Sequence, residues 1–543
     1  MQNSWLVLLP PLIVVFLAAT TQRVIFSLLS GILTALLIVN DFSITKAVPQ
    51  LLSRIWARTE LGTITSWQSF WATWNLFIVL FLLILGILIV VINASGGAYA
   101  YADAVSKRLK SPKHAELSSL VLSLFFFVDD YFSCLTVGSV MQAITDRFRI
   151  PRVKLAVLVN SMAVPLVVIV PVSSWVAEIT MQLRTSGVAA TPASDVLVVG
   201  DPFFIYTHVI PFIFYSFILI ASVLFMISWR MSFGLVRAHE KIALESGNLF
   251  GGKMPVTRRV RNLDHESMKK SSVIDFLLPI GVLFGAVVVG ILYFGDYVGM
   301  GGNNSLIQAL QQTKIAPALF VGAVVALIAS LALYLVEGKF YLREIPGFFA
   351  DGIKLMWSAV FVLILIWTLS KLMINDLAIG TYLANVLIGH LPLAFLPVMF
   401  FITAVLTAST MGSAWGSIGI LVPIAIPMLT SFSSVHGPVD VAMLPILYPL
   451  IGAIISGAVV GNHVSPISDT MLMSSTSAGA YHLDVVRAQF EVTFPTIVST
   501  ALSFLIAGVL MANGYSWMIS SGASLGAGLI CNVLILSLLS KRR

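Results

Sequence analysis

Apolar runs of about 20 residues recur along the whole chain, and they limit its fold more than any other feature. A helix that crosses a lipid bilayer needs about 20 mostly apolar residues. Backbone amides and carbonyls inside lipid must be satisfied within the segment, so such runs are expected to be helices. The sequence therefore predicts an all-α polytopic membrane protein. The runs are 5–20, 23–40, 72–93, 117–145, 151–176, 203–229, 274–294, 316–336, 357–374, 396–430, 441–472, 492–512 and 516–540.

Charged residues are too rare for a soluble protein. They make up 10% of the 543 residues, whereas 58% are apolar, and soluble domains carry about 25% charged residues. A disordered chain would have many charges and few apolar residues. The composition therefore excludes a soluble globular enzyme and a disordered chain. The two cysteines, Cys134 and Cys531, give neither a disulfide framework nor metal-site spacing.

Lys and Arg mark the cytoplasmic side of a membrane protein. Residues 230–271 hold nine of them against four acids, and the chain ends on Lys541-Arg542-Arg543, so both segments should be cytoplasmic. Basic residues flank the run 117–145 on both sides, whereas the flanks of the run 396–430 contain none. We therefore predict two re-entrant hairpins that enter from opposite sides. The other runs give about 11 crossings, with the N-terminus outside and the C-terminus cytoplasmic.

The two halves of the chain carry similar features in the same order. Each predicted hairpin is followed by a span with a Pro/Ser break, near Pro171 in the first half and near Pro466 in the second. An odd number of crossings per half would invert the second half, and inverted repeats with interrupted helices are typical of secondary transporters. Chance similarity among apolar sequences is the alternative. We expect a first repeat at 1–229, a cytoplasmic basic loop at 230–271, a second inverted repeat at 272–512, and an extra last helix with a basic C-terminus at 513–543.

Polar residues inside the apolar runs are costly, so they mark an ion or substrate path. Asp129 and Asp130 are adjacent near the middle of the first hairpin, and Thr136 follows as an oxygen ligand. Two neighbouring carboxylates repel each other, which suits the exchange of a proton for a cation that takes oxygen ligands. Alternatively, Asp130 only caps a half-helix by accepting backbone N–H bonds.

The densest polar stretch in any predicted span surrounds Pro466, which should break the helix. His463 could titrate near neutral pH, or only bond to a neighbouring helix. The oxygens and amide around the break are expected to bind the cation or proton, and they belong to Asn462, Ser465, Ser468, Asp469 and Thr470.

Two other segments offer supporting ligands. Ser173 and Ser174 follow the first break, and Ser413 and Ser417 lie among the small residues of the second hairpin. Small residues allow close backbone approach and exposed carbonyls, although plain helix packing is the alternative there. Glu178 either shares a helix face with Ser174 or is solvated at the membrane surface. Four polar residues near predicted ends are expected to be solvated: Asp296, Asp351, Asn375 and Asp376.

Several of these stretches together resemble the NhaC family of sodium/proton antiporters. The matching stretches are Val128-Asp-Asp-Tyr-Phe132, Leu135-Thr-Val-Gly138, Thr145-Asp-Arg147, Pro171-Val-Ser-Ser-Trp175, Gly412-Ser-Ala-Trp-Gly-Ser417 and Ser465-Pro-Ile-Ser-Asp-Thr470. The resemblance runs end to end. It implies exchange of Na+ for H+ across a bacterial inner membrane, with Na+ at Asp129, Asp130 and Asp469 and with no cofactor. Some relatives resemble organic-acid or amino-acid exchangers instead.

The chain departs from the family pattern at two positions. Acids often stand in the family where this chain has Asn160 and Asn462. The loss of two buried acids would change the proton stoichiometry or remove sodium coupling at one site. Asp129, Asp130 and Asp469 remain, so cation coupling stays the leading prediction.

Other functions are weighed against this one. A cation-coupled exchanger or symporter of a small carboxylate or amino acid is the first alternative, with the anion held at helix N-termini near Ser413, Ser417 and Ser465. No Arg lies in the predicted span cores, which counts against it. A channel usually repeats its filter by oligomerisation, and an intramembrane enzyme needs catalytic motifs that are absent here. The expected partners are the lipid bilayer, the sodium ion and the proton; a homodimer is a further option, and no nucleic acid is expected.

Overall fold

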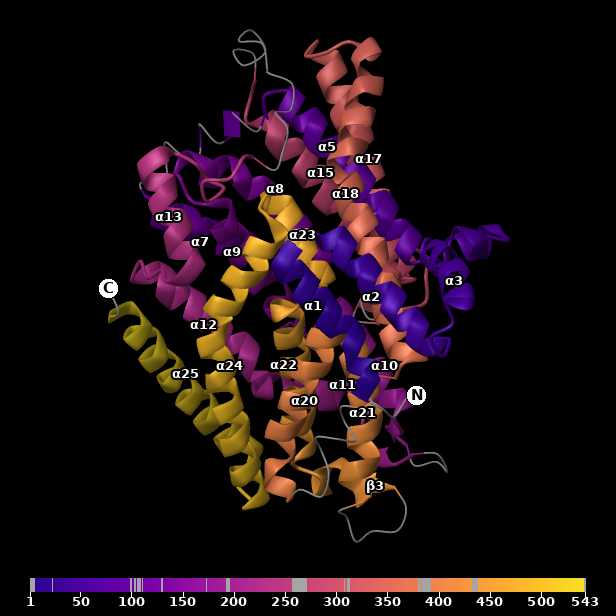
Figure 1. Cartoon of the computed structure of the whole chain (residues 1–543), viewed down its shortest axis with the longest axis vertical. Coiled ribbons are helices and arrows are strands. Elements are labelled where there is room, and N and C mark those ends of the chain that lie inside the picture. The colour runs from indigo at the N-terminus through magenta and orange to yellow at the C-terminus, as the bar shows by residue number, and fades with distance from the viewer. Residues whose placement is uncertain are drawn as a thin grey trace.

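A computed structural model describes residues 5–541 apart from a set of gaps. The gaps are 22, 98–99, 102–103, 105–108, 110, 128–129, 172, 192–195, 256–270, 307, 310–312, 379–381, 383–391 and 432–437. Nearly all of the described chain is helical (Figure 1), as the apolar runs predict.

Most helices of both halves fall in the predicted runs. The first half contains α1 (Leu9–Thr21), α2 (Val24–Val39), α3 (Ile44–Ala57), α4 (Trp67–Phe70), α5 (Asn75–Ala94), α7 (Pro112–Ser123), α8 (Asp130–Arg147), α9 (Arg152–Ile169), α10 (Ser174–Thr185), α11 (Pro202–Val209), α12 (Phe214–Ser228) and α13 (Gly234–Ser246). The second half contains α15 (Ile274–Phe294), α17 (Ile315–Val336), α18 (Ile345–Lys371), α20 (Leu396–Met411), α21 (Ala414–Ser431), α22 (Leu447–Val464), α23 (Asp469–Ala478), α24 (His482–Ala512) and α25 (Trp517–Lys541).

Short turns and three short strands complete the described elements. The 3-10 turns are Trp5–Leu8, Leu61–Thr63, Ile210–Phe212, Val298–Met300, Leu342–Glu344, Leu393–Phe395 and Val441–Met443, and a π turn covers Leu372–Asp376. The strands β1 (Val188–Ala189), β2 (Val198–Val199) and β3 (Val439–Asp440) form a parallel sheet in the order β1-β2-β3. Val198 pairs with Val188 on one side and Val439 on the other. The sheet thus joins the loop after α10 to the loop before α22.

Eight helices in the described part are long and apolar enough to cross a membrane, or up to ten if each of two bent pairs is one span. One bend, of 42°, separates α11 from α12. These helices confirm the polytopic all-α membrane protein. The number of crossings and the limits of the two repeats stay predictions.

Each run predicted to be a hairpin contains two helices. The run 117–145 becomes α7 and α8, and the run 396–430 becomes α20 and α21. Gly412 lies between α20 and α21 with a left-handed φ of +66°, a conformation that glycine adopts at no steric cost. The segment Leu393–Met411 is itself long enough to span a membrane, so the re-entrance of this hairpin stays a prediction.

The helices gather into two bundles. In the first, α5 packs against α17 and α18, α15 packs against α17, and α2 packs against α18 (Figure 1). The second contains α7–α12 and α20–α25, with α22 packed between α20, α21 and α24. α18 and α23 form a main contact between the bundles. Their meeting surface includes a very small cavity whose lining is almost entirely apolar: Leu82, Leu135, Leu363, Leu472, Met473 and Thr476.

Candidate functional site

A helix break at 465–468 organises the polar stretch of the second repeat. α22 ends at Val464, and Ser465 has an extended backbone with φ −85° and ψ 129°. Pro466 imposes this conformation, because its ring disfavours a helical residue immediately before it. α23 then begins at Asp469, with Ser468 as its N-cap. The break that the sequence predicts is therefore confirmed.

Asn462 is the centre of the hydrogen bonds around this break. Its Oδ1 accepts from the hydroxyl of Ser468 and from Thr470 Oγ1, the latter at 2.6 Å. Ser468 Oγ in turn accepts from the backbone N–H of Met471 at 3.4 Å. These side chains are all buried, so the interaction fixes the short segment between α22 and α23. Three of the predicted oxygen ligands are therefore brought together.

Asp469 receives hydrogen bonds on both of its carboxylate oxygens. Its Oδ1 accepts from the backbone N–H of Thr470 at 2.8 Å, and its Oδ2 accepts from the hydroxyl of Tyr131. Only 7% of Asp469 is exposed. A buried carboxylate at the N-terminal turn of a helix also gains from the partial positive charge of the helix end. A buried charge without such hydrogen bonds would be costly, so these donors stabilise the acid at this site.

Tyr131 places the predicted hairpin of the first repeat against the break of the second. It lies in the first turn of α8, directly after Asp130, which is also buried. Ser477 Oγ donates to the Cys134 carbonyl at 2.7 Å, and Gln142 donates to the Ser477 carbonyl. α8 and α23 are thus joined along their length. Asp129 lies outside the described residues.

The other break and the other hairpin also meet. α9 ends at Ile169, where Val170 is extended before Pro171, and α10 starts at Ser174. The ring of Trp175 on α10 contacts the ring of Trp415 on α21, with centroids 4.0 Å apart and the ring planes tilted by 39°. α8 thus packs against α23, and α10 packs against α21.

The predicted serines of this second region mostly bond to the backbone. Ser173 Oγ donates to the Val167 carbonyl at 2.7 Å, and Ser417 Oγ donates to the Ala404 carbonyl at 3.3 Å. Ser413 Oγ accepts from the Gly416 N–H at 3.2 Å, so it caps α21. The side chains of Ser174 and Glu178 lie outside the described residues.

The tip between α20 and α21 lies against the other break. Ser465 Oγ donates to the Ser409 carbonyl at 2.7 Å. Gly412 faces the backbone of Ile467 so closely that a side chain there would overlap the Ile467 carbonyl. The tip of this hairpin therefore touches the segment that leads into Asp469.

Several buried polar atoms have no hydrogen-bond partner within the described part of the chain. They include both amide atoms of Asn160, Nε2 of His463 and Oγ1 of Thr136. His463 Nδ1 lies 2.9 Å from the hydroxyl of Tyr215, which supports its reading as a helix–helix hydrogen bond. Asn160 is fully buried on α9. A buried amide without a partner is costly, so a ligand or an internal water is expected there.

Comparison with known proteins identifies the family. A sequence model described as the Na+/H+ antiporter family matches residues 202–509. An uncharacterized protein of Haemophilus influenzae is 31% identical over 507 residues, 92% of this chain and 90% of that protein. The chain belongs to the Na+/H+ antiporter family.

A partial sequence match and two weak structural likenesses are also found. The Malate-2H(+)/Na(+)-lactate antiporter of Bacillus subtilis is 27% identical over 202 residues, 36% of this chain and 38% of that protein. The YdaH transporter of Alcanivorax borkumensis gives a TM-score of 0.33 at 13% identity, covering 94% of this chain and 99% of that one. MtrF of Neisseria gonorrhoeae gives 0.30 at 11%, covering 90% and 84%. The names of these three proteins describe two transporters and an efflux pump.

Sequence reasoning about this antiporter-family chain missed two residues of the site. Tyr131 and Tyr215 are uncharged aromatic residues in apolar runs, so the search for charges and small oxygen ligands passed over them. The position of Tyr131 next to Asp130 is the signal that could have found it.

The prediction that Asp376 is solvated is wrong, because it is half buried and accepts from Arg54 Nη2 at 2.9 Å. Asp296, Asp351 and Asn375 are exposed, as predicted.

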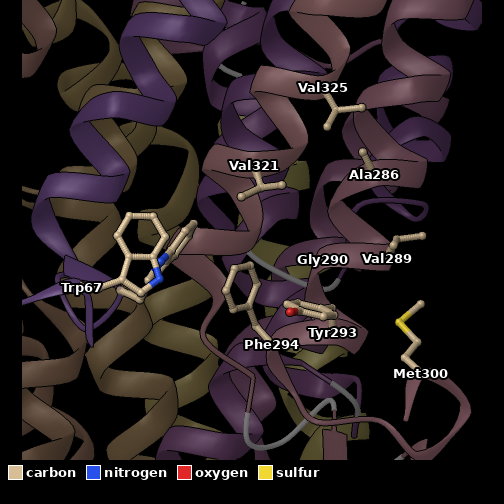
Figure 2. Close-up of a pocket in the computed structure, with 10 residues that line it drawn as sticks. Trp67, Ala286, Val289, Gly290, Tyr293, Phe294, Met300, Val321 and Val325 are labelled. Carbon is tan, nitrogen blue, oxygen red and sulfur yellow. The ribbon is translucent and has the colours of Figure 1, made fainter. Parts of the chain in front are cut away.

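A large apolar groove lies away from these residues. It has a volume of about 670 Å³. Figure 2 shows Tyr293 and Phe294 of α15 near Trp67, with Val321 and Val325 of α17 farther along. It contains none of the predicted site residues, and its apolar lining does not suit an ion.

Across the described residues, no group of three or more His, Cys, Asp or Glu side chains could hold a metal ion. A cation near Asp469 would therefore depend largely on neutral oxygens.

Proposed function

We propose that this protein is a secondary antiporter that exchanges Na+ for H+ and that Asp469 carries the exchange. The observation behind this proposal is a buried carboxylate at a helix break, beside the oxygens of Asn462, Ser468 and Thr470. Intramembrane acids of this kind typically lie on ion paths. Membership of the Na+/H+ antiporter family supports the same reading.

One carboxylate can serve both ions in turn. An ionised Asp469 attracts a cation, whereas a proton on the same carboxylate removes that attraction. Interrupted helices supply unwound carbonyls and polar side chains for Na+ in other transporters. Here Asn462, Ser468 and Thr470 would complete the set, with Ser465 nearby. Na+ and H+ would then compete for one place, which couples their opposite movements.

The acids of the first hairpin are proposed to share this role. Asp130 is buried one residue before Tyr131, whose hydroxyl reaches Asp469. Asp129, although outside the described residues, precedes Asp130 directly. Asn160 and Asn462 are neutral where acids often stand in the family pattern, so fewer titrating groups are available. We therefore propose that Asp129, Asp130 and Asp469 supply the proton coupling.

The two bundles suggest how access would alternate. α23, which begins at Asp469, packs against α18 of the first bundle. The side chains that line the small cavity there are mostly leucines, and no charged residue is among them. An apolar surface of this kind lacks directional bonds, so one bundle can move against the other around the site.

The proposed membrane orientation also has support. β2 pairs with β3, so two loops predicted to be external lie together. Lys253 bonds Asp484 at 2.8 Å, which joins two segments predicted to be cytoplasmic. We propose a bacterial inner-membrane location with the N-terminus outside and the C-terminus inside. A homodimer is compatible with this orientation.

Everted membrane vesicles test the proposed exchange. A respiration-driven pH gradient, followed by acridine orange fluorescence, should collapse on addition of NaCl to vesicles that contain the wild type. Asp469→Asn and Asp130→Asn should abolish the response. Asp351→Asn is the matched control, because Asp351 is exposed and distant in sequence from the site. If neither sodium nor lithium changes the gradient, the proposed exchange is wrong.

Exchange of a small carboxylate is the second candidate function. The Bacillus subtilis relative is named as an antiporter of malate and protons against sodium and lactate. That name combines the same two ions with organic acids. Carboxylate cargo would add to the cation exchange proposed here rather than replace its cation site.

A further inference from the structure

The apolar groove of Figure 2 takes no part in the proposed exchange. It follows the seam between α15 and α17, which pack together. Gly290 lies against Ala318, and Gly322 lies against Val287, so the two helices are antiparallel and in close contact. The volume of the groove, about 670 Å³, falls in the range of pockets that hold an organic molecule. The groove is therefore large enough for a ligand of its own.

The side chains along the groove are exposed although they are apolar. Val289 of α15 is 52% exposed, and Val325 of α17 is 42% exposed. Both helices are long and apolar enough to span a membrane, so these side chains lie at the depth of the hydrocarbon layer. Water does not fill a groove there. An acyl chain is the occupant that this position favours.

One end of the groove carries aromatic side chains with polar tips. Tyr293 lies in the last turn of α15, Trp67 belongs to α4, and both are exposed. Figure 2 shows them near Phe294. Tyr and Trp are typical of the interface between hydrocarbon and lipid headgroups. This end of the groove therefore lies at headgroup level, on the side that we propose to be external.

A lysine lies at the same level. The Thr313 hydroxyl donates to the Ile291 carbonyl at 2.8 Å, so the start of α17 is beside the last turn of α15. Lys314 is the N-cap of α17 and is exposed. It precedes Val321 by about two helical turns and Val325 by about three, so the three residues follow one side of α17. The apolar groove thus ends near a cation.

The charge of this lysine is available to a ligand. Lys314 forms no ion pair with another described residue, and the first turn of α17 contains no acid. Asp296 also follows α15, but its carboxylate already accepts from the backbone N–H of Asn303 at 3.1 Å. An ammonium group beside an apolar groove suits an amphiphile with an anionic head, and phosphate is a common partner of lysine.

We propose that the groove between α15 and α17 binds one phospholipid of the leaflet on the external side. One acyl chain lies along Val321 and Val325. The phosphate pairs with Lys314, and the headgroup accepts from the Tyr293 hydroxyl and the Trp67 N–H. The lipid anchors the outer end of the first bundle while the second bundle moves. The inference does not depend on which ions the protein exchanges.

Native mass spectrometry of the purified full-length protein tests this site. The protein is delipidated in a nonionic detergent and titrated with dioleoyl phosphatidylglycerol or with dioleoylglycerol, which has the same acyl chains and no phosphate. One phosphatidylglycerol per chain should bind before any other, and dioleoylglycerol should bind at least about tenfold more weakly. Equal binding of the two lipids, or phosphatidylglycerol binding without a first tight site, overturns the proposal.

Two variants with matched controls place the lipid. Val325→Trp fills the groove and should raise the Kd for phosphatidylglycerol about tenfold or more, whereas Ile328→Trp, at an exposed residue of α17 outside the groove, should leave it within about twofold. Lys314→Gln should raise the same Kd about tenfold and leave that of dioleoylglycerol unchanged. Lys371→Gln, at an exposed lysine that ends α18, is its control. An unchanged Kd in either Val325→Trp or Lys314→Gln overturns the site.

A second copy of the chain is the other occupant that would cover such a groove. The same spectra give the mass of the assembly and therefore distinguish the two occupants. Loss of the tight lipid in Val325→Trp, at an unchanged mass of the protein assembly, supports the proposal. If Val325→Trp instead converts a dimer to a monomer that keeps its lipid, the groove is an interface between copies and the lipid site is wrong.

Discussion

Asp469 is held from two sides by groups that come from different halves of the chain. The Thr470 N–H belongs to its own helix, whereas the Tyr131 hydroxyl comes from the first half. Each donor stabilises the ionised carboxylate in a buried place. The side chain most central to the proposed exchange is therefore oriented by a residue that is more than 300 positions away in the sequence.

Tyr131→Phe tests this orientation. The substitution keeps the ring and removes one hydrogen bond to a charged group, which contributes about 1.5–3 kcal/mol. The apparent KM for Na+ should rise about tenfold, as measured in everted vesicles over a range of NaCl concentrations. Tyr515→Phe, at an exposed tyrosine, is the control. A wild-type KM in Tyr131→Phe would mean that the hydroxyl does not orient the working carboxylate.

At the scale of elements, proline-imposed breaks and a glycine tip build the site. α9 and α22 both end at the residue before the extended pre-proline residue, and the tip between α20 and α21 reaches the second break. The loop segment that follows α12 forms α13, which packs on α9 and α24. These elements fix the ends of the helices that carry the polar residues.

Gly412→Ala tests the hairpin tip. An alanine at this position is held at a left-handed φ, which lowers stability by about 1–2 kcal/mol. Its Cβ also overlaps the Ile467 carbonyl. Gly514 has a φ of +78° with open space around it, so Gly514→Ala carries the backbone cost alone. The thermal unfolding temperature and the rate of sodium-dependent transport should both be lowered more by Gly412→Ala than by Gly514→Ala. Equal effects would show that contact with Ile467 does not matter.

The docking of α13 should depend on pH through His239. Burial lowers the pKa of His239 from its usual 6.5, while the nearby Asp484 raises it and Lys253 lowers it. The docked loop therefore binds fewer protons than the undocked loop. Docking is at full strength above about pH 6.5 and weakens as pH falls below it.

Hydrogen exchange measures this docking. After correction for intrinsic rates, the amides of Gly234–Ser246 should exchange faster at pH 5.5 than at pH 7.5. His239→Gln should remove most of that difference. A difference of the same size in His239→Gln would show that His239 does not cause the pH effect.

At the scale of the whole molecule, ion pairs between distant segments agree with the predicted sides of the membrane. Arg54 pairs with Asp376, and both lie in segments predicted to be external. Lys154 bonds Glu116 at 2.6 Å and Glu240 at 2.7 Å, and all three lie at predicted cytoplasmic ends. These pairs were not used to derive the topology. They support the proposed sides of the membrane.

A reversible cross-link between the bundles tests their relative motion. Leu363 of α18 and Leu472 of α23 line the same small cavity, so oxidation of Leu363→Cys/Leu472→Cys should stop transport and reduction should restore it. The control is Gly290→Cys/Ala318→Cys, where a Cβ at Gly290 would lie 3.2 Å from that of Ala318 within the first bundle. Full transport in the oxidised inter-bundle variant would contradict the proposed motion.

The sequence predicts much of the fold because the length of an apolar run and the position of a proline each determine local structure. The apolar runs locate nearly every long helix, and Pro171 and Pro466 locate both breaks. α3 and α13 are missed, because neither contains a long apolar run. The partners of Asp469 and Asp376 could not be predicted, since Tyr131 and Arg54 reach them through tertiary packing.

Purified protein in liposomes gives the most direct test of Asp469 as the shared site for Na+ and H+. An imposed outward proton gradient should drive uptake of radioactive sodium, and a trapped pH dye should report matched proton loss. Both fluxes should be absent in Asp469→Asn and present in Asp351→Asn. Sodium uptake without proton movement, or both fluxes retained in Asp469→Asn, would contradict the account.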